Sequence, residues 1–182
     1  LFFLRSKSHL IKTSVFSSVV PKIYKIIKSF LINTIKVKSI ELKEINLKKI
    51  INIKVNKKQI GSDRLANAIS VSDNKNNFII VDFGTATTFD VVIKNNYLGG
   101  IIAPGVNLSL NTLISNASLI PNLNLKSINS VLGKNTKNAV RSGFYWGYVG
   151  LIEKIINKIL GKNTKNAVRS GFYWGYVGLI EK

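Results

Sequence analysis

Residues 78–92 constrain the fold of this chain more than any other segment. Two β-branched, apolar runs flank a Gly-Thr-Ala-Thr turn at 84–87, and Asp82 lies near the end of the first run. The pattern predicts two strands joined by a tight turn. Such a turn exposes backbone N–H groups, threonine hydroxyls add donors, and the carboxylate can hold a cation against negative oxygens. The segment therefore predicts a hairpin that binds phosphate groups, with a nucleotide as the natural ligand.

Further elements are expected on both sides of this hairpin. Asn95 and Asn96 are typical of a type I′ turn, and a third strand over 97–105 leads to a helix over about 106–120, before Pro121. The apolar residues of this helix are expected to face the core. Residues 35–55 alternate apolar side chains with Lys or Glu, which fits short strands or the edge of a helix.

The N-terminal part predicts a strand over 13–20 and a helix that Pro21 opens. Apolar side chains recur along this helix at helical spacing, and we expect them to pack in the core. They are Ile23, Ile26, Ile27, Phe30 and Leu31.

Two short polar segments are expected to begin helices. In the first, Gly-Ser-Asp-Arg at 61–64, the serine or the aspartate can cap the helix, and an acid is favoured near its positive end. In the second, Gly-Lys-Asn-Thr at 133–136, the asparagine or the threonine can do the same. Taken alone, both segments are helix caps.

Three motifs follow one another along the chain: Gly-Ser-Asp-Arg at 61–64, Asp-Phe-Gly-Thr-Ala-Thr-Thr at 82–88 and Gly-Gly-Ile-Ile-Ala-Pro-Gly at 99–105. In these motifs the chain resembles the type III pantothenate kinases of the acetate and sugar kinase/Hsp70/actin superfamily. The resemblance implies an α/β fold of the RNase H-like actin and sugar-kinase type. It implies an incomplete first domain over 1–72, including the Gly-Ser-Asp-Arg motif, and most of a second domain with the phosphate hairpin over 73–159. The last segment, 160–182, is an exact repeat of 132–154.

The same resemblance implies a reaction and its site. ATP, accompanied by magnesium, would phosphorylate pantothenate to 4′-phosphopantothenate, the first step of coenzyme A biosynthesis. Asp63 would accept the proton of the pantothenate hydroxyl, and Arg64 would hold the carboxylate side of the substrate. The implied substrate-binding residues are Gly61, Ser62, Asp63, Arg64 and Thr136.

For the nucleotide, the resemblance implies that Gly84 and Thr85 bind ATP and that Asp82 lies by a monovalent cation, potassium or ammonium. Without it, Asp82 also fits a strand-end acid that binds a turn amide. Asp90, one strand later, is expected only to be solvated. The family also includes proteins described as Bvg accessory factors, so a non-catalytic transcriptional regulator is the alternative function.

The net charge of +19 would ordinarily suggest nucleic acid or an anionic membrane. The positive residues are nearly all Lys, spread along the chain beside many Asn and Ile, without an aromatic and basic platform, so we expect no nucleic-acid partner. No membrane partner is expected either, because the apolar runs are shorter than the ~20 residues of a membrane span. The absence of Cys excludes disulfides and fits a reducing cytoplasm.

Residues 132–154 and 160–182 are identical over 23 residues. Two copies are too few for a solenoid, which needs about three. We expect the second copy to have no site of its own, and the linker over 155–159 to be helical. In the first copy, a stripe of Gly143, Gly147 and Gly150 predicts a close contact, across a homodimer.

Several features depart from the family pattern. The chain begins at Leu1, contains no Met, and lacks both the Asp-x-Gly-Asn-Thr phosphate loop and the Thr-Gly-Gly adenosine loop. Lys54 and Lys57 stand where relatives have a substrate-contacting Tyr and a Pro. We therefore expect a chain truncated at both ends, inactive alone, whose full-length parent is the kinase.

Overall fold

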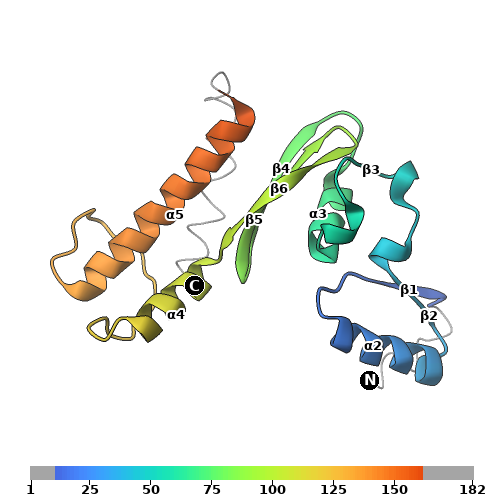
Figure 1. Cartoon of the computed structure of the whole chain (residues 1–182), viewed down its shortest axis with the longest axis horizontal. Helices are drawn as coiled ribbons and strands as arrows, with labels where there is room; N and C mark the ends of the chain where they lie inside the picture. The colour runs from blue at the N-terminus through green and yellow to red at the C-terminus, as the bar shows by residue number, and fades with distance from the viewer. Residues whose placement is uncertain (1–10, 162–182) are drawn as a thin grey trace. The chain divides into compact units, whose positions relative to one another are not determined.

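The computed structural model of the chain describes residues 11–161 (Figure 1). In chain order the elements are β1 (Thr13–Phe16), α2 (Pro21–Phe30), the π-helical turn η2 (Leu31–Ile35), β2 (Lys38–Glu41), the 3-10 turns η3 (Leu42–Glu44) and η4 (Leu47–Lys49), β3 (Asn52–Ile53), the 3-10 turn η5 (Lys57–Gln59), α3 (Ser62–Val71), β4 (Asn77–Phe83), β5 (Ala86–Ile93), β6 (Asn96–Pro104), α4 (Val106–Asn116) and α5 (Thr136–Leu160).

The described residues form two compact units. Residues 11–82 and 88–102 belong to the first unit, and residues 83–87 and 103–161 belong to the second. The chain therefore passes between the units at the β4–β5 turn and again within β6. The predicted domain boundary after residue 72 concerns the domains of the family and stays a prediction.

A four-stranded sheet in the order β3-β6-β5-β4 carries the predicted hairpin. Two-residue turns join β4 to β5 and β5 to β6, so these strands are antiparallel, whereas β3 pairs with β6 in parallel. The predicted hairpin and third strand are confirmed. The predicted type I′ turn is wrong: the turn residues are Lys94 and Asn95, and only Lys94 has a positive φ, of 52°.

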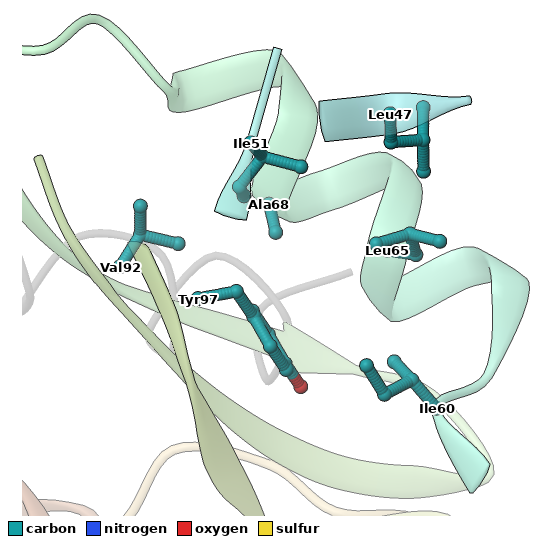
Figure 2. Packing of buried hydrophobic residues seen from close by; sticks show 7 residues of the cluster. All are labelled: Leu47, Ile51, Ile60, Leu65, Ala68, Val92 and Tyr97. Atoms are coloured by element: carbon teal, nitrogen blue, oxygen red, sulfur yellow. The ribbon is translucent and has the colours of Figure 1, made fainter. Parts of the chain in front are cut away.

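The core of the first unit lies between α3 and the sheet. Leu65 and Ala68 lie on one face of α3 because they are three residues apart, and neither is exposed. Figure 2 shows the ring of Tyr97, from β6, lying among these side chains. The rest of the cluster is Leu47, Ile51, Ile60 and Val92. This packing holds α3 against β5 and β6.

The N-terminal elements are less buried than the sequence predicts. The strand β1 pairs in parallel with β2 and ends at Phe16, so the predicted strand over 13–20 is too long. Pro21 does open α2, as predicted. The predicted core packing of α2 is wrong, because the helix has no buried residue and Ile26 is 62% exposed. Helical spacing predicts an apolar face without saying what covers it.

In the second unit, α4 begins at Val106 as expected but ends at Asn116, four residues short of Ile120. Its apolar face contributes one buried residue, Leu110. The helix α5 begins after Asn135, whose side chain accepts from the backbone N–H of Asn138 at 2.9 Å, so the predicted cap is confirmed. The predicted helical linker over 155–159 is confirmed as well.

None of the helices between residues 11 and 161 combines the length and the apolar character that a membrane-spanning helix needs. The second copy of the repeat, apart from its first two residues, lies outside the described residues. Its expected lack of a site therefore stays a prediction.

The glycine stripe of α5 lies open. A Cβ at Gly143, Gly147 or Gly150 would meet nothing within 4 Å. The described residues thus place no other backbone against the stripe, and the predicted dimer contact stays a prediction.

We expect Gly147→Ala to raise the free energy of unfolding by about 0.5–1 kcal/mol, because alanine loses less backbone entropy than glycine inside a helix. Thermal unfolding of the chain at low concentration, where a dimer dissociates, measures this. A lower midpoint than that of the wild type would contradict the open environment of Gly147.

Candidate functional site

The helix α3 begins at the Gly-Ser-Asp-Arg motif. Its N-cap is Gly61, with φ −60° and ψ 143°, and no side chain caps the helix. Ser62 is buried, and its hydroxyl donates to a carboxylate oxygen of Glu41 at the end of β2. The prediction that Ser62 or Asp63 caps α3 is therefore wrong, because both residues already lie within the first helical turn.

Asp63 presents an exposed carboxylate at the start of α3. Its Oδ1 accepts from the backbone N–H of Arg64 at 2.8 Å, while Oδ2 has no hydrogen-bond partner within residues 11–161. A Cβ on Gly61 would lie 2.3 Å from this Oδ1, so glycine leaves room for the carboxylate at the helix start. One carboxylate oxygen is thus available to accept a proton.

Arg64 forms an ion pair with Asp90, 26 residues away on β5. The Nε of Arg64 donates to Oδ1 and Oδ2 of Asp90 at 3.0 and 3.1 Å, and Nη2 donates to Oδ1 at 2.7 Å. The hydroxyl of Tyr97 donates to the same Oδ1 at 2.5 Å. Asp90 is 1% exposed, so the prediction that it is only solvated is wrong. Its position on the inner face of β5 turns it toward α3.

Asp90 affects the pKa of both groups that donate to it, Arg64 and Tyr97. Hydrogen bonding to Asp90 raises the pKa of the Arg64 guanidinium above its usual value. Burial, and then the hydrogen bond to Asp90, raise the pKa of the Tyr97 hydroxyl. Arg64 therefore stays cationic and Tyr97 stays a neutral donor throughout the physiological pH range.

Gly100 on β6 leaves the space that the ion pair fills. A Cβ there would lie 2.4 Å from Nη2 of Arg64, 2.7 Å from Oδ1 of Asp90 and 2.1 Å from the carbonyl oxygen of Phe89. Any side chain at this position would displace the guanidinium. The Arg64–Asp90 pair thus explains why the second residue of the Gly-Gly motif, Gly100, is a glycine.

Asp82 lies half-buried near the end of β4. Its Oδ2 accepts from the side-chain amide of Asn67, on α3, at 3.0 Å. This partner is a helix side chain, whereas the alternative reading of the sequence expected a turn amide. Residues 11–161 contain no cluster of three or more His, Cys, Asp or Glu that could hold a metal ion. One carboxylate fits a cation held jointly with phosphates better than a cage built only from protein.

In the second unit, Gly84 and Thr85 form an exposed turn. The N–H of Gly84 donates to the carbonyl of Ala86 at 3.0 Å, so this donor is used within the turn. Gly105, the N-cap of α4, donates its N–H to the carbonyl of Thr85 at 3.0 Å. A Cβ on Gly105 would lie 2.2 Å from the carbonyl oxygen of Gly84. The turn is thereby held against the positive end of α4, which no side chain caps.

The other threonines of the hairpin do not present donors. Thr87 is fully buried, and its Oγ1 and that of Thr88 have no partner among the described residues. Thr136 is the exposed first residue of α5, and the cap is formed by Asn135. Its hydroxyl is therefore left to solvent or a ligand.

Lys54 and Lys57 stand at the two positions where the resemblance predicts a Tyr and a Pro. Of these two lysines, Lys57 has a structural role. Its ammonium donates to the carbonyl oxygens of Lys43 and Ile45 at 2.7 and 3.0 Å. Lys54 is exposed.

Sequence reasoning missed Asp90, Tyr97 and Gly100. A signal for Asp90 was present: a carboxylate inside an apolar strand has to find a cation or donors, because an unpaired buried charge is very costly. The partner was not predictable, since Arg64 lies on a different element.

The family model described as type III pantothenate kinase matches residues 2–158 of the chain. The chain belongs to the type III pantothenate kinase family. Membership confirms the expected α/β fold of the actin and sugar-kinase kind.

Individual type III pantothenate kinases are also similar to this chain in sequence. A type III pantothenate kinase of Pelagibacter ubique is 57% identical over 155 residues, which are 85% of this chain and 62% of that protein. The type III pantothenate kinases of Koribacter versatilis and Acidiphilium cryptum are 45% and 50% identical, over 55% and 54% of this chain and 37% and 38% of theirs. The chain thus matches between about a third and two thirds of the length of these type III pantothenate kinases.

A solved structure from Campylobacter jejuni, described as a Baf family transcriptional activator, has a similar fold. Its TM-score is 0.54 at 22% identity, covering 79% of this chain and 64% of that one. At this identity the likeness concerns the fold alone.

Proposed function

We propose that this chain is part of an ATP-dependent pantothenate kinase that produces 4′-phosphopantothenate, the first step of coenzyme A biosynthesis. The observation that carries the proposal is the start of α3. There the exposed carboxylate of Asp63 precedes the guanidinium of Arg64, which an ion pair with the buried Asp90 holds in place. Membership of the family supports assigning these two groups to a hydroxyl and a carboxylate of one substrate.

In the proposed reaction, Asp63 takes the proton of the pantothenate primary hydroxyl. The hydroxyl oxygen then bonds to the γ-phosphorus of ATP, and the bond from that phosphorus to the β,γ-bridging oxygen breaks, releasing ADP. Such transfers depend mainly on positioning and on neutralising phosphate charge. Because the Ser62 hydroxyl already bonds to Glu41, a contact of Ser62 with substrate would come from its backbone.

For ATP, we propose that the exposed turn at Gly84 and Thr85 contacts the phosphates. Its attachment to the uncapped start of α4 supports this, because helix N-termini attract anions. Magnesium would supply charge neutralisation at the phosphates. Asp82, whose Oδ1 makes no hydrogen bond within residues 11–161, would hold a potassium or ammonium ion.

Further parts of the proposal concern Thr136, assembly and location. The exposed Thr136 would contact pantothenate, and two chains would form a homodimer through the open glycine stripe. The reaction would take place in the cytoplasm.

The proposed dimer is tested by light scattering of Gly147→Leu, because a leucine would block the close approach of the two helices and lower the measured mass. An unchanged dimeric mass would exclude the stripe as the interface.

The function is tested by incubating the protein with ATP, magnesium, potassium and pantothenate and following the products by mass spectrometry. We expect a product heavier than pantothenate by one phosphoryl group, formed together with ADP. Omitting pantothenate provides the control. Pantothenate binding without any product, in the full-length parent as well as in this chain, would favour the non-catalytic regulator instead.

A further inference from the structure

We propose that Asp90 and Tyr97 are positioning residues that hold the guanidinium of Arg64 by its Nε–Nη2 edge and leave the adjacent Nη1–Nη2 edge open for the substrate carboxylate. This inference rests on the proposed function. It adds two residues that touch no substrate themselves and act through Arg64.

The hydrogen bonds of Arg64 define which edge is held. Nε and Nη2 donate to Asp90 at 2.7–3.1 Å, which is the side-on arrangement of a guanidinium and a carboxylate. A guanidinium carries five N–H donors in a rigid plane. The second N–H of Nη2 and one N–H of Nη1 form a further fork, on the end of the group. Within residues 11–161, Nη1 makes no hydrogen bond, so this fork remains for a planar acceptor such as a carboxylate.

Asp90 cannot itself serve the substrate. Its Oδ1 accepts from Nε and Nη2 of Arg64 and from the hydroxyl of Tyr97, and its Oδ2 accepts from Nε. The side chain of Asp90 is 1% exposed, whereas that of Arg64 is 12% exposed. Asp90 is therefore closed to solvent, whereas part of the Arg64 side chain, next to Asp63 in the chain, remains exposed.

Tyr97 and Gly100 fix the position of this pair. The hydroxyl of Tyr97 bonds to Asp90 from β6, while its ring lies in the core beneath α3 (Figure 2). Gly100 leaves the space into which Nη2 fits. The guanidinium is thus held between α3, β5 and β6. This suits a group that has to present two donors at a fixed angle, since a freely rotating arginine would lose entropy on binding.

Positioning of Arg64 and neutralisation of its charge predict opposite effects of a substitution at Asp90. Asp90 neutralises Arg64, so if charge alone mattered, removing the Asp90 charge would strengthen binding of an anionic substrate. If positioning matters, loosening the Arg64–Asp90 pair weakens the binding of that substrate. Tyr97→Phe is the sharper variant, because it removes one hydrogen bond to Asp90 without changing any charge.

The experiment measures, by calorimetry, the binding of pantothenate and of pantothenol, the analogue in which an alcohol replaces the carboxylate. The wild type should bind pantothenate about 10- to 100-fold more tightly, as expected for hydrogen bonds to a charged group. Tyr97→Phe should reduce this ratio by about 2- to 10-fold, and Asp90→Asn should reduce it further. A purely structural role would weaken both ligands equally and leave the ratio unchanged.

Tyr148→Phe is the matched control. Its hydroxyl also makes hydrogen bonds, with Ser109 at 2.7 Å and with the carbonyl of Pro104 at 3.2 Å, but it lies on α5. This variant should leave the ratio at the wild-type value. An unchanged ratio in Tyr97→Phe, or a raised ratio in Asp90→Asn, overturns the proposal.

A second readout needs no ligand. Held side-on, the guanidinium of Arg64 should give separate nitrogen NMR signals for Nη1 and Nη2, which merge in Tyr97→Phe as the group rotates more freely. The amide spectrum of the same sample shows whether the variant is folded. Equal signals in the wild type overturn the inference even if pantothenate binds. If the signals are separate but neither ligand binds to the wild type, the proposed function fails and the assignment to a substrate carboxylate fails with it.

Discussion

Asp63→Asn should lower the rate of pantothenate phosphorylation by about 100- to 10,000-fold, the usual contribution of a general base. The amide keeps the shape of the side chain and can still accept from the N–H of Arg64, but it cannot take the hydroxyl proton. Because Asp63 is exposed, the fold should be almost unaffected. A coupled assay of ADP release, run on the full-length parent if this chain alone is inactive, measures the rate.

Glu153→Gln is the control for Asp63→Asn. It also removes one exposed carboxylate, in the last third of α5, and should leave the rate unchanged. A turnover in Asp63→Asn close to that of this control would exclude Asp63 as the proton acceptor.

Leu65→Ala should lower the free energy of unfolding by about 2–5 kcal/mol, because it opens a cavity at a fully buried position between α3 and the sheet. This loss is a large part of the free energy of unfolding of a typical domain, which is about 5–15 kcal/mol. Since α3 also carries Asp63 and Arg64, the loss of packing should reach the site. Urea unfolding followed by circular dichroism measures the effect.

Leu108→Ala makes the same change on α4, where the side chain is 48% exposed, and should cost less than about 1 kcal/mol. If the two leucine variants unfold at the same urea concentration, the core does not lie where the structure places it.

The sequence predicted the elements whose signals are local. The β4–β5 hairpin follows from two apolar runs around a glycine turn, α2 from the proline at its first position, and α5 from the side chain of Asn135. Each of these depends on residues within a few positions of one another. The end of α4 was predicted too late because Pro121 lies beyond the point where the helix ends, at Asn116.

The contacts that shape the candidate site could not be predicted in the same way. Arg64 was assigned to the substrate by resemblance, but its partner Asp90 is 26 residues away and meets it only because α3 packs on the sheet. The burial of Ser62 also depends on a distant residue, because its partner Glu41 lies 21 residues earlier, at the end of β2. Helical periodicity likewise showed that α2 has an apolar face, and the exposure of Ile26 shows that a pattern does not specify its cover.

A crystal structure of the protein with pantothenate tests the central claim most directly, that Asp63 and Arg64 act on one substrate. We predict the primary hydroxyl of pantothenate about 2.6–3.2 Å from the Asp63 carboxylate, within hydrogen-bond reach. Its carboxylate should contact Nη1 and Nη2 of Arg64, while Nε stays on Asp90. Pantothenate bound away from α3, or bound with its carboxylate on a cation other than Arg64, would contradict the account.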